Sequence, residues 1–134
     1  MIFVDTSAWY AVEVEDDVNH EQACKFLSEI ASRKHGVAIT TDCVLDETLT
    51  LLRLRRGLAP ASNFIDKIRR SGSVRIFWIN EDLFEKALYI FQRSDGKRWS
   101  FTDCTSFALM RDLAIPNAFT FDRNFRDAGL QALP

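Results

Sequence analysis

Short apolar runs alternate along the chain with longer segments in which apolar residues recur at helical spacing. Runs rich in β-branched and aromatic residues predict strands at 2–4, 37–40, 74–79 and 118–121, with a short edge strand at 130–133. Helical periodicity predicts helices at 8–14, 17–34, 42–56, 59–70, 81–91, 103–113 and 122–128. Because short strands and helices alternate, we expect an α/β fold with three layers. Helices cover both faces of a central parallel sheet of four or five strands.

Capping residues mark several of the predicted helix ends. Thr6 or Ser7 is suited to cap the first helix, and Asn80 is suited to cap the helix over 81–91. Gly36 and Gly57 follow the second and third helices, where a glycine ends a helix at low steric cost. These signals support the predicted order of elements.

The length and composition suit one domain. The chain has 134 residues, 47% of them hydrophobic, and contains no Gly-, Ser- or Pro-rich linker. We therefore expect a single domain over residues 1–134 that folds without disulfides. The three cysteines, Cys24, Cys43 and Cys104, are odd in number and far apart, which favours free thiols in a reducing compartment. No apolar run is long enough to span a bilayer, and we expect a cytoplasmic protein.

Charge and histidine content narrow the chemistry only slightly. The formal net charge of −2 argues against a basic, non-specific nucleic-acid coat. It does not exclude a nuclease, because active-site carboxylates lower the overall charge and bound cations reverse the local field. Neither His20 nor His35 has a cysteine or histidine at the sequence spacing of a metal-ligand motif, so a structural zinc site is not expected.

Two aspartates stand at the ends of predicted strands. Asp5 follows the first strand, and Asp122 follows the fourth. In parallel α/β sheets, ligands bind beyond the carboxyl ends of the strands, at the point where the strand order reverses. We therefore expect both carboxylates at one edge of the sheet, in the position of an active site.

Two further acids are candidates for the same site. Asp103 opens a predicted helix, where the helix N-terminus stabilises negative charge. Glu47 stands beside Asp46 in a predicted helix whose apolar face is centred near Thr48. With about 100° of rotation per residue, Asp46 points away from that face, whereas Glu47 lies on its rim, against the protein body. Glu47 is therefore the better candidate.

Each of these acids also has a purely structural interpretation. Asp5 can cap the following helix, and Asp122 can form an Asx-turn. Asp103 can act as a partner of the helix dipole, and Glu47 can form a surface ion pair. Convergence of all of them on one edge favours a site, because like charges held together are unfavourable unless a cation neutralises them. Clustered carboxylates without histidine or thiolate suit a hard cation such as Mg²⁺ or Mn²⁺.

Four segments spread over essentially the whole chain carry a family pattern. They are Phe3-Val4-Asp5-Thr6-Ser7-Ala8, Glu47, Ser100-Phe101-Thr102-Asp103 and Phe121-Asp122-Arg123-Asn124-Phe125. In their order they resemble the PIN-domain ribonucleases, in particular the VapC-type toxins of prokaryotic toxin–antitoxin pairs. No single segment is specific, whereas the ordered set of four acids is fairly specific.

The resemblance implies a PIN-like α/β/α fold, dependence on Mg²⁺ or Mn²⁺, and endonucleolytic cleavage of RNA by the toxin of a VapBC-type pair. It assigns the catalytic and metal-binding roles to four acids, Asp5, Glu47, Asp103 and Asp122. It assigns supporting hydroxyl groups near the metal to Thr6 and Thr102. It also implies a homodimer and an antitoxin protein that inserts into the active-site groove.

One departure from the family pattern is the aromatic pair Trp9-Tyr10, which stands where smaller aliphatic residues are commoner. Such a pair would narrow the groove or meet a partner, so the substrate preference of a relative is not carried over.

Basic residues next to the acids are candidates for RNA contact. Lys97 and Arg98 precede Asp103 and are suited to hold phosphates. Trp99 adds a ring on which a base can stack. Arg123, directly after Asp122, completes this candidate set.

Other classes of protein fit the sequence less well. A haloacid-dehalogenase-like enzyme needs a second aspartate two residues after the first, but that position is Ser7. Neither the paired acids and later lysine of a receiver domain nor a Gly-x-Gly-x-x-Gly or Walker A motif is present. The alternative is a catalytically weak PIN-like nucleic-acid-binding or interaction module outside a toxin–antitoxin pair. Such a module would more naturally have lost one of the four acids.

Overall fold

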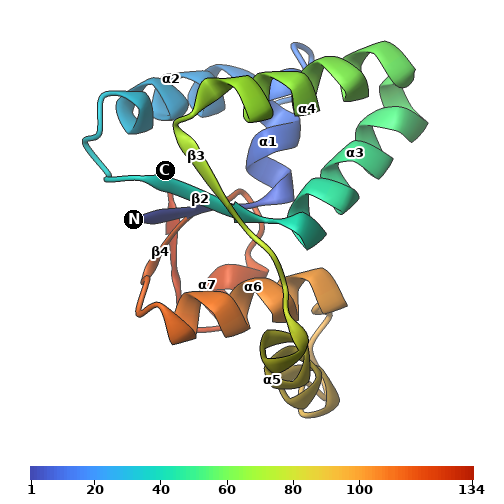
Figure 1. The fold of residues 1–134 in the computed structure, drawn as a ribbon, viewed down its shortest axis with the longest axis vertical. Coiled ribbons are helices and arrows are strands. Elements are labelled where there is room, and N and C mark those ends of the chain that lie inside the picture. Colours follow the sequence, from blue (N-terminus) through green and yellow to red (C-terminus); the bar gives the residue numbers. More distant parts are fainter.

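Five parallel strands form the centre of the protein in the computed structural model, which describes residues 1–134 (Figure 1). The strands are β1 (Ile2–Val4), β2 (Ala38–Thr41), β3 (Val74–Phe77), β4 (Asn117–Phe119) and β5 (Gln131–Leu133). They lie in the order β3-β2-β1-β4-β5, and every neighbouring pair is parallel. The predicted fold class is confirmed, with five strands in the sheet.

The order in which the chain adds strands to the sheet reverses at β1. From β1 the chain adds β2 and then β3 on one side, and it returns to add β4 and β5 on the other side. Phe3 of β1 is therefore paired with Ile39 of β2 and with Ala118 of β4. The carboxyl ends of β1 and β4 meet at this reversal, which is where α/β sheets bind their ligands.

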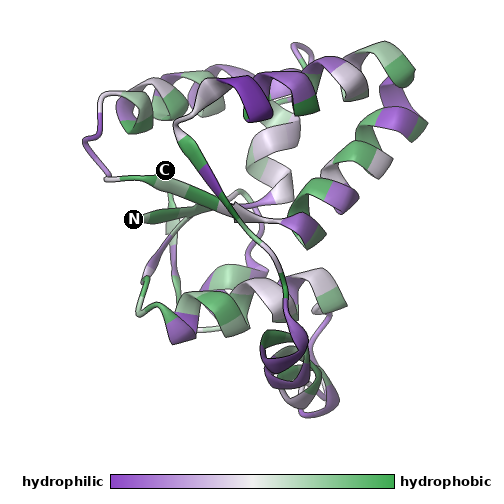
Figure 2. Ribbon diagram, viewed as in Figure 1, coloured by the Kyte–Doolittle hydropathy of each residue, from purple (hydrophilic) through white to green (hydrophobic).

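Seven helices complete the three layers (Figure 1). They are α1 (Thr6–Glu13), α2 (His20–Ala31), α3 (Asp42–Arg56), α4 (Leu58–Ser71), α5 (Glu81–Gln92), α6 (Phe101–Asp112) and α7 (Asn124–Asp127). Helices α1, α2 and α4 lie on one side of the sheet and α6 and α7 on the other, while α5 packs on α6. In Figure 2 much of the sheet is coloured hydrophobic, whereas hydrophilic residues follow the outer sides of the helices.

The core is built on β1, whose three residues are fully buried. Phe107 of α6 packs edge-on against Phe125 of α7 with their ring centroids 5.1 Å apart, and Phe125 in turn packs against Phe3 at 6.1 Å. These three side chains have no exposed surface. Their burial fixes α6 and α7 against β1, and so fixes the residues at the ends of these elements.

The second helix is shorter than predicted. It spans His20–Ala31, whereas the periodicity predicted a helix over 17–34. At its start Asp17 accepts the backbone N–H of Asn19 at 2.8 Å in an Asx-turn, which competes with helix formation. At its end Arg33 takes a positive φ of 61°, which turns the chain before Gly36. A Cβ at Gly36 would lie 2.9 Å from the nitrogen of Met1, so glycine is also required there by the close approach of the N-terminus.

Two other helices begin two residues before their predicted starts. The first begins at Thr6, and its N-cap is Asp5 rather than Thr6 or Ser7. The sixth begins at Phe101 with Ser100 as N-cap, so Asp103 is its third residue rather than its first. Ser100 and Asp103 form a capping box, in which each side chain accepts a backbone N–H of the other residue. The Ser-x-x-Asp spacing carried this signal in the sequence.

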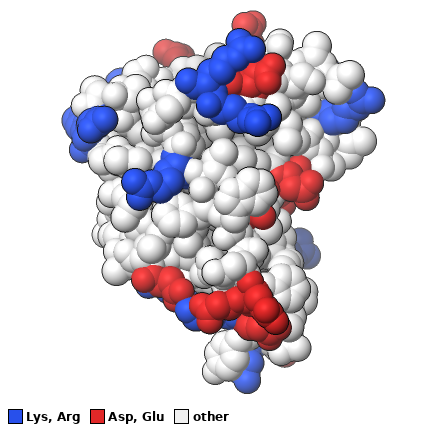
Figure 3. All heavy atoms as spheres, in the orientation of Figure 1, with Lys and Arg blue, Asp and Glu red and all other residues white.

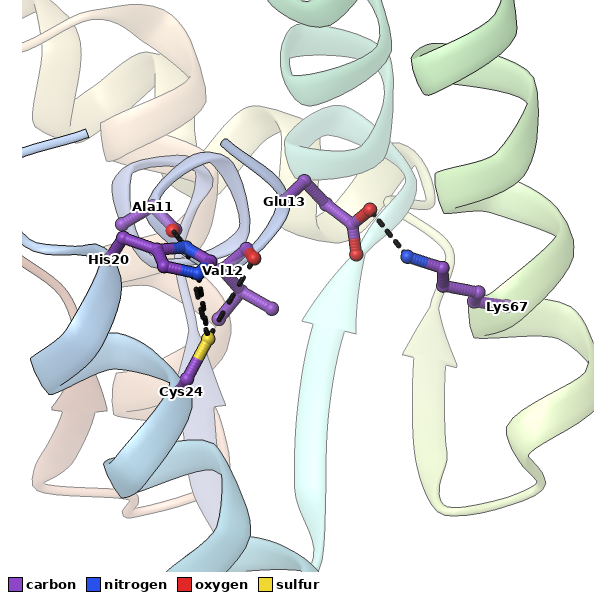
Figure 4. A network of polar contacts seen from close by, with 6 residues as sticks. All are labelled: Ala11, Val12, Glu13, His20, Cys24 and Lys67. Atoms are coloured by element: carbon purple, nitrogen blue, oxygen red, sulfur yellow. Dashed lines mark hydrogen bonds and ion pairs between the residues drawn. The ribbon is translucent and has the colours of Figure 1, made fainter. Parts of the chain in front are cut away.

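Polar contacts fasten helices α2 and α4 to the end of α1 (Figure 4). The imidazole of His20 lies 2.8 Å from the carbonyl oxygen of Ala11 and 3.6 Å from Sγ of Cys24, one helical turn away. The prediction that His20 has no cysteine partner is therefore wrong, although two side chains are fewer than the four ligands of a structural zinc site. On the other side Lys67 of α4 pairs with Glu13 of α1 at 2.8 Å.

The aromatic pair of α1 lies in the core. Trp9 is 2% exposed and packs against Phe64 of α4 with ring centroids 5.8 Å apart, and Tyr10 is 8% exposed. The prediction that this pair narrows an active-site groove is wrong, because both rings are enclosed between helices. None of the helices has the length and apolar composition needed to cross a membrane.

Candidate active site

Asp5 and Asp122 lie on the two strands that flank the reversal in the sheet. Asp5 directly follows β1, and its backbone N–H donates to the carbonyl oxygen of Phe119, the last residue of β4, at 3.1 Å. Asp122 follows three residues later on the β4 side. Parallel pairing of β1 with β4 therefore brings both acids to the same edge of the sheet, as the sequence predicted.

Hydroxyl groups hold the Asp5 carboxylate from two sides. Its Oδ2 accepts hydrogen bonds from the Ser7 hydroxyl at 2.7 Å and from the Thr120 hydroxyl at 3.0 Å. Thr120 Oγ1 also accepts the backbone N–H of Asp122 at 3.0 Å, so one threonine connects the two acids. Ser7 is fixed in turn by the backbone N–H of Phe121, which donates to its Oγ at 3.0 Å.

Glu47 reaches the same edge from α3. Its Oε2 accepts a hydrogen bond from the Thr6 hydroxyl at 2.6 Å, next to Asp5 in the chain. Glu47 is half-buried, whereas its neighbour Asp46 is exposed, as expected from their positions around the helix. The helix is aligned for this contact by Thr41, whose hydroxyl accepts the backbone N–H of Val44 and caps its first turn.

Asp103 is joined to Asp122 through Asn124. The amide nitrogen Nδ2 of Asn124 lies 3.0 Å from Oδ2 of Asp103 and 3.4 Å from Oδ2 of Asp122. The backbone N–H of Asn124 donates to the other oxygen of Asp122 at 2.8 Å. All four acids, which we call the acidic quartet (Asp5, Glu47, Asp103 and Asp122), are thus linked by hydrogen bonds through single intervening residues or chain neighbours.

Burial raises the pKa values of three members of the quartet, and repulsion from other carboxylates adds to the shift for Glu47 and Asp103. Burial raises the pKa of Asp103 to about 6, and the charges of Asp5 and Asp122 push it in the same direction. The pKa of Glu47 is raised chiefly by burial, and then by the charges of the same two aspartates and of Asp46. Burial also raises the pKa of Asp5, although the hydrogen bonds from Ser7 and Thr120 oppose this shift. The carboxylates therefore destabilise one another when all are charged.

No basic side chain neutralises the quartet. The ion pairs of the protein all involve other acids, which are Glu13, Asp16, Glu29, Asp82 and Asp112. Four uncompensated carboxylates, with oxygen donors alone, have the donor chemistry that a hard divalent cation requires. The side chains do not form a closed group of three metal ligands. Asp5 and Asp103 each direct an oxygen at internal hydrogen-bond donors. Each carboxylate keeps further lone pairs for a ligand.

The structural interpretations of three of the acids hold beside this arrangement, whereas Glu47 does not form the surface ion pair considered for it. Asp5 caps α1, Asp103 belongs to a capping box, and Asp122 accepts the N–H of Asn124 in an Asx-turn. These local contacts position each carboxylate, but they do not explain why Glu47 reaches the same edge through Thr6 or why no lysine or arginine forms an ion pair with the quartet. Local capping and a shared metal site are therefore compatible uses of the same side chains.

The supporting residues differ partly from those expected. Thr6 contacts Glu47, whereas the hydroxyl of Thr102 makes no hydrogen bond to the quartet. Ser7, Thr120 and Asn124 were not expected at the site, although they bind its carboxylates directly. Ser7 and Asn124 each stand two residues after an acid of the quartet, at the spacing of an Asx-turn, and this was the available signal.

The candidate RNA-binding residues lie beside the site. The backbone carbonyl oxygen of Arg98 is 3.5 Å from Nδ2 of Asn124, and Lys97, Arg98 and Arg123 are exposed. Trp99 is half-buried, and it packs edge-on against Phe107 with ring centroids 5.2 Å apart. Its ring therefore has one side committed to the core, which limits the surface free for stacking.

The main hollow of the protein lies away from the acids. It has a volume of about 660 Å³ and is lined by residues of α1, α2 and α4 and by the first residues of β2 and β3. No member of the quartet lines it or either of two smaller hollows. Trp9 and Val74 contribute apolar surface to it, while Arg33, Lys67 and Arg75 contribute positive charge.

Comparisons with known proteins agree with the fold. The profile of the PIN domain matches residues 2–130. A Mycobacterium tuberculosis protein named 23S rRNA-specific endonuclease VapC20 is 41% identical over 129 residues, which are 96% of this chain and 95% of that protein. The chain therefore belongs to the PIN-domain family.

Further relatives place it within a branch of that family. An Archaeoglobus fulgidus protein named VapC ribonuclease is 28% identical over 91% of this chain and 77% of its own length. The crystal structure of Mycobacterium tuberculosis VapC20, described as a Sarcin-Ricin loop cleaving toxin, has a TM-score of 0.89 at 39% identity over 99% of this chain and 98% of that one. FitAcB from Neisseria gonorrhoeae shares the fold, with a TM-score of 0.70 at 14% identity over 100% and 97% of the two chains. The predicted resemblance to VapC-like toxins is confirmed.

The raised pKa of Asp103 predicts a pH-dependent stability of the metal-free protein. Because its folded pKa of about 6 exceeds the ordinary value of 3.8, the folded form holds a proton that the unfolded form has lost between these values. This group therefore lowers the free energy of unfolding as the pH rises from about 4 to 6. Asp103→Asn removes this loss, so the variant gains stability relative to the wild type over that range in urea denaturation with EDTA.

The exposed, unpaired Asp95 provides the matched control. Asp95→Asn is expected to keep a nearly constant difference from the wild type over the same pH range. A difference for Asp103→Asn that does not change with pH contradicts the proposed electrostatics.

Proposed function

We propose that this chain is a metal-dependent endoribonuclease, the toxin of a VapBC-type toxin–antitoxin pair, with the acidic quartet as its catalytic and metal-binding site. The observation that carries this proposal is the meeting of four carboxylates from separate segments with no basic partner. The family and the activities named for its relatives support RNA as the substrate.

We propose Mg²⁺ or Mn²⁺ as the metal, because the quartet offers oxygen atoms alone. The histidines and cysteines of the chain are not members of the quartet, so softer metals that favour nitrogen or sulfur lack their preferred ligands. A divalent cation also offsets the repulsion that contributes to the raised pKa values of Glu47 and Asp103, and it compensates the buried charge of Asp5.

The chemistry proposed is hydrolysis of an RNA phosphodiester bond. Bound divalent ions supply a lower pKa for the attacking water and neutralise charge on the phosphate. The protein holds the four carboxylates on one edge, and Thr6 orients Glu47 while Ser7 and Thr120 orient Asp5. Attack by water breaks the bond between phosphorus and the 3′ oxygen. The expected products have a 5′-phosphate and a 3′-hydroxyl group.

The relative named a 23S rRNA-specific endonuclease makes 23S rRNA the first substrate to test. We propose a structured ribosomal RNA loop as the target, since the match to that relative, at 41% identity, covers 96% of this chain and its crystal structure is described as that of a Sarcin-Ricin loop cleaving toxin. The alternative is an inactive PIN-like interaction module. Such a module neither cleaves RNA nor melts at a higher temperature when Mn²⁺ is added.

The neighbouring acids Glu47 and Asp46 provide a matched pair for the test of activity. Glu47→Gln keeps the shape of the side chain but removes a charge from the quartet, so we expect kcat to fall by at least about 100-fold, beyond the typical effect of an outer-shell change. Asp46→Asn removes the same charge from an exposed position one residue away and should leave kcat nearly unchanged. The measurement is cleavage of 23S rRNA in Mn²⁺, with analysis of the product ends.

Equal activity of the wild type and Glu47→Gln, or equal loss in both variants, would rule out the assigned role of Glu47. Asp5→Asn serves as a second inactivating variant, and the background cleavage it shows sets the limit of detection.

We propose that Lys97 and Arg98 bind RNA phosphates, with Arg123 beside them and Trp99 as the edge of the binding surface. All three basic side chains are exposed. In the chain, Lys97 and Arg98 precede Asp103, and Arg123 directly follows Asp122. Lys97→Ala combined with Arg98→Ala should weaken binding and reduce the slope of log K against log salt by about 0.7 for each phosphate that is no longer bound. Binding of a fluorescent RNA at several salt concentrations measures this slope.

Helix α4 supplies the control for this test, because it carries basic side chains of its own, among them Lys67 and Arg69. Figure 3 shows Lys and Arg gathered in this region, whereas acidic side chains gather over α5. The matched control is Arg69→Ala with Arg70→Ala, which leaves the Glu13–Lys67 pair intact. An equal reduction of slope in the control would show that the effect is not specific to the loop before α6.

We also propose a homodimer formed through the aromatic residues around α5. Trp78 is 74% exposed, and Phe84, Tyr89 and Phe91 of the adjoining helix are 46%, 59% and 44% exposed. Such a group of exposed aromatic side chains is uncommon on a monomer, and a second copy of the chain would cover it.

The dimer proposal predicts a change of mass in solution. Trp78→Asp introduces a charge into the proposed interface and should convert a dimer into a monomer of 15.4 kDa, measured by light scattering after gel filtration. Val18→Asp, at a position 96% exposed in the turn before α2, should leave the mass of the dimer unchanged. A wild type of monomeric mass would exclude this surface as a dimer interface.

The antitoxin partner proposed for this toxin needs a surface that accepts a protein segment. The hollow of about 660 Å³ has apolar walls and the basic residues Arg33 and Arg75, beside the Glu13–Lys67 pair, so it suits an apolar segment that also carries acidic side chains. We propose that the antitoxin fills this hollow, while a further part of it reaches the acidic quartet.

A further inference from the structure

The side chain of Asn124 lies between two acids of the quartet and binds both. Its Nδ2 donates to Oδ2 of Asp103 at 3.0 Å and to Oδ2 of Asp122 at 3.4 Å. The carbonyl oxygen of Arg98, 3.5 Å away, is a third acceptor facing the same nitrogen. Because all these neighbours are acceptors, the amide must present its NH₂ group rather than its oxygen to them.

The two carboxylates come from different parts of the fold and repel each other. Asp103 stands in the first turn of α6, whereas Asp122 stands in the loop after β4. The ion pairs of the protein involve neither carboxylate, so no lysine or arginine neutralises this pair. Asn124 is therefore the neutral group that keeps this pair together against its own repulsion.

Each of the two carboxylates is fixed at more than one point. The backbone N–H of Ser100 binds Oδ2 of Asp103 at 2.9 Å, and the backbone N–H of Asn124 binds Oδ1 of Asp122 at 2.8 Å. The amide of Asn124 adds the one contact common to both. A carboxylate has about four lone-pair sites, so these bonds orient the groups without occupying all of their acceptor positions.

We propose that Asn124 is a positioning residue that presets the spacing and orientation of Asp103 and Asp122 for a divalent cation. This inference rests on the proposed metal site. Ligating carboxylates are commonly oriented by hydrogen bonds from residues behind them, and loss of such a residue weakens metal binding by about 10–100-fold. Asn124 acts through the two aspartates and is not itself assigned as a ligand.

The test is the affinity of the purified full chain for Mn²⁺, measured by isothermal titration calorimetry without RNA. Asn124→Ala removes the amide, and Asn124→Leu removes it while keeping most of its volume. Both variants should bind Mn²⁺ about 10–100-fold more weakly than the wild type. Cooperative thermal melting in EDTA verifies that each variant is folded.

Asn80 provides a matched control of the same residue type. Its Oδ1 accepts the backbone N–H of Leu83 at 2.9 Å and caps α5, so Asn80→Ala should lower the melting temperature but leave the Mn²⁺ affinity unchanged. A purely structural role for Asn124 would give this same result.

The outcomes separate the inference from the proposal on which it rests. A wild type that binds Mn²⁺, with Asn124→Ala and Asn124→Leu binding equally well or better, would overturn the role of Asn124 and leave the metal site standing. A wild type and variants that bind no Mn²⁺ would overturn the metal site and this role together.

Discussion

Repulsion among four carboxylates is the constraint around which this end of the molecule is organised. Burial opposes ionisation of Asp5, Glu47 and Asp103, neighbouring charges add to this for Glu47 and Asp103, and no lysine or arginine forms an ion pair with them. The hydrophobic core offsets this cost, because β1 is fully buried and fixes the positions from which the acids project. Hydroxyl and amide groups then hold each carboxylate in place. The stability of the core thus offsets the unfavourable free energy of the carboxylates clustered at this edge of the sheet. Binding of a cation there would stabilise the folded chain further.

Much of this arrangement could be predicted from the sequence because its signals are local. Alternation of strands and helices predicted the sheet, and the position of Glu47 around α3 separated it from Asp46. The predicted bounds of α2 were too wide, because the turn hydrogen bond at Asp17 and the conformation of Arg33 confine the helix to the residues that carry the apolar pattern. The contacts of Thr120 and Asn124 were missed because they join residues brought together by the fold.

The same side chains serve local structure and the proposed chemistry. Asp5 caps α1 while its other neighbours include Thr120, which is far away in the chain. Asp103 similarly closes a capping box and contacts Asn124. A capping role for an acid is therefore weak grounds for dismissing it as a site residue, since the cap supplies the rigid orientation that a ligand-binding carboxylate needs.

The pairing of β1 with β4 also sets when the chain becomes able to act. Asp5 is synthesised long before the strand that brings Asp122 beside it, because β4 follows α6 in the chain. A nascent chain on the ribosome carries most of its core elements before β4 has emerged, and it then lacks the neighbour that completes its central strand. An RNA-cleaving protein of this fold thus acquires its active conformation only after β4 has emerged from the ribosome.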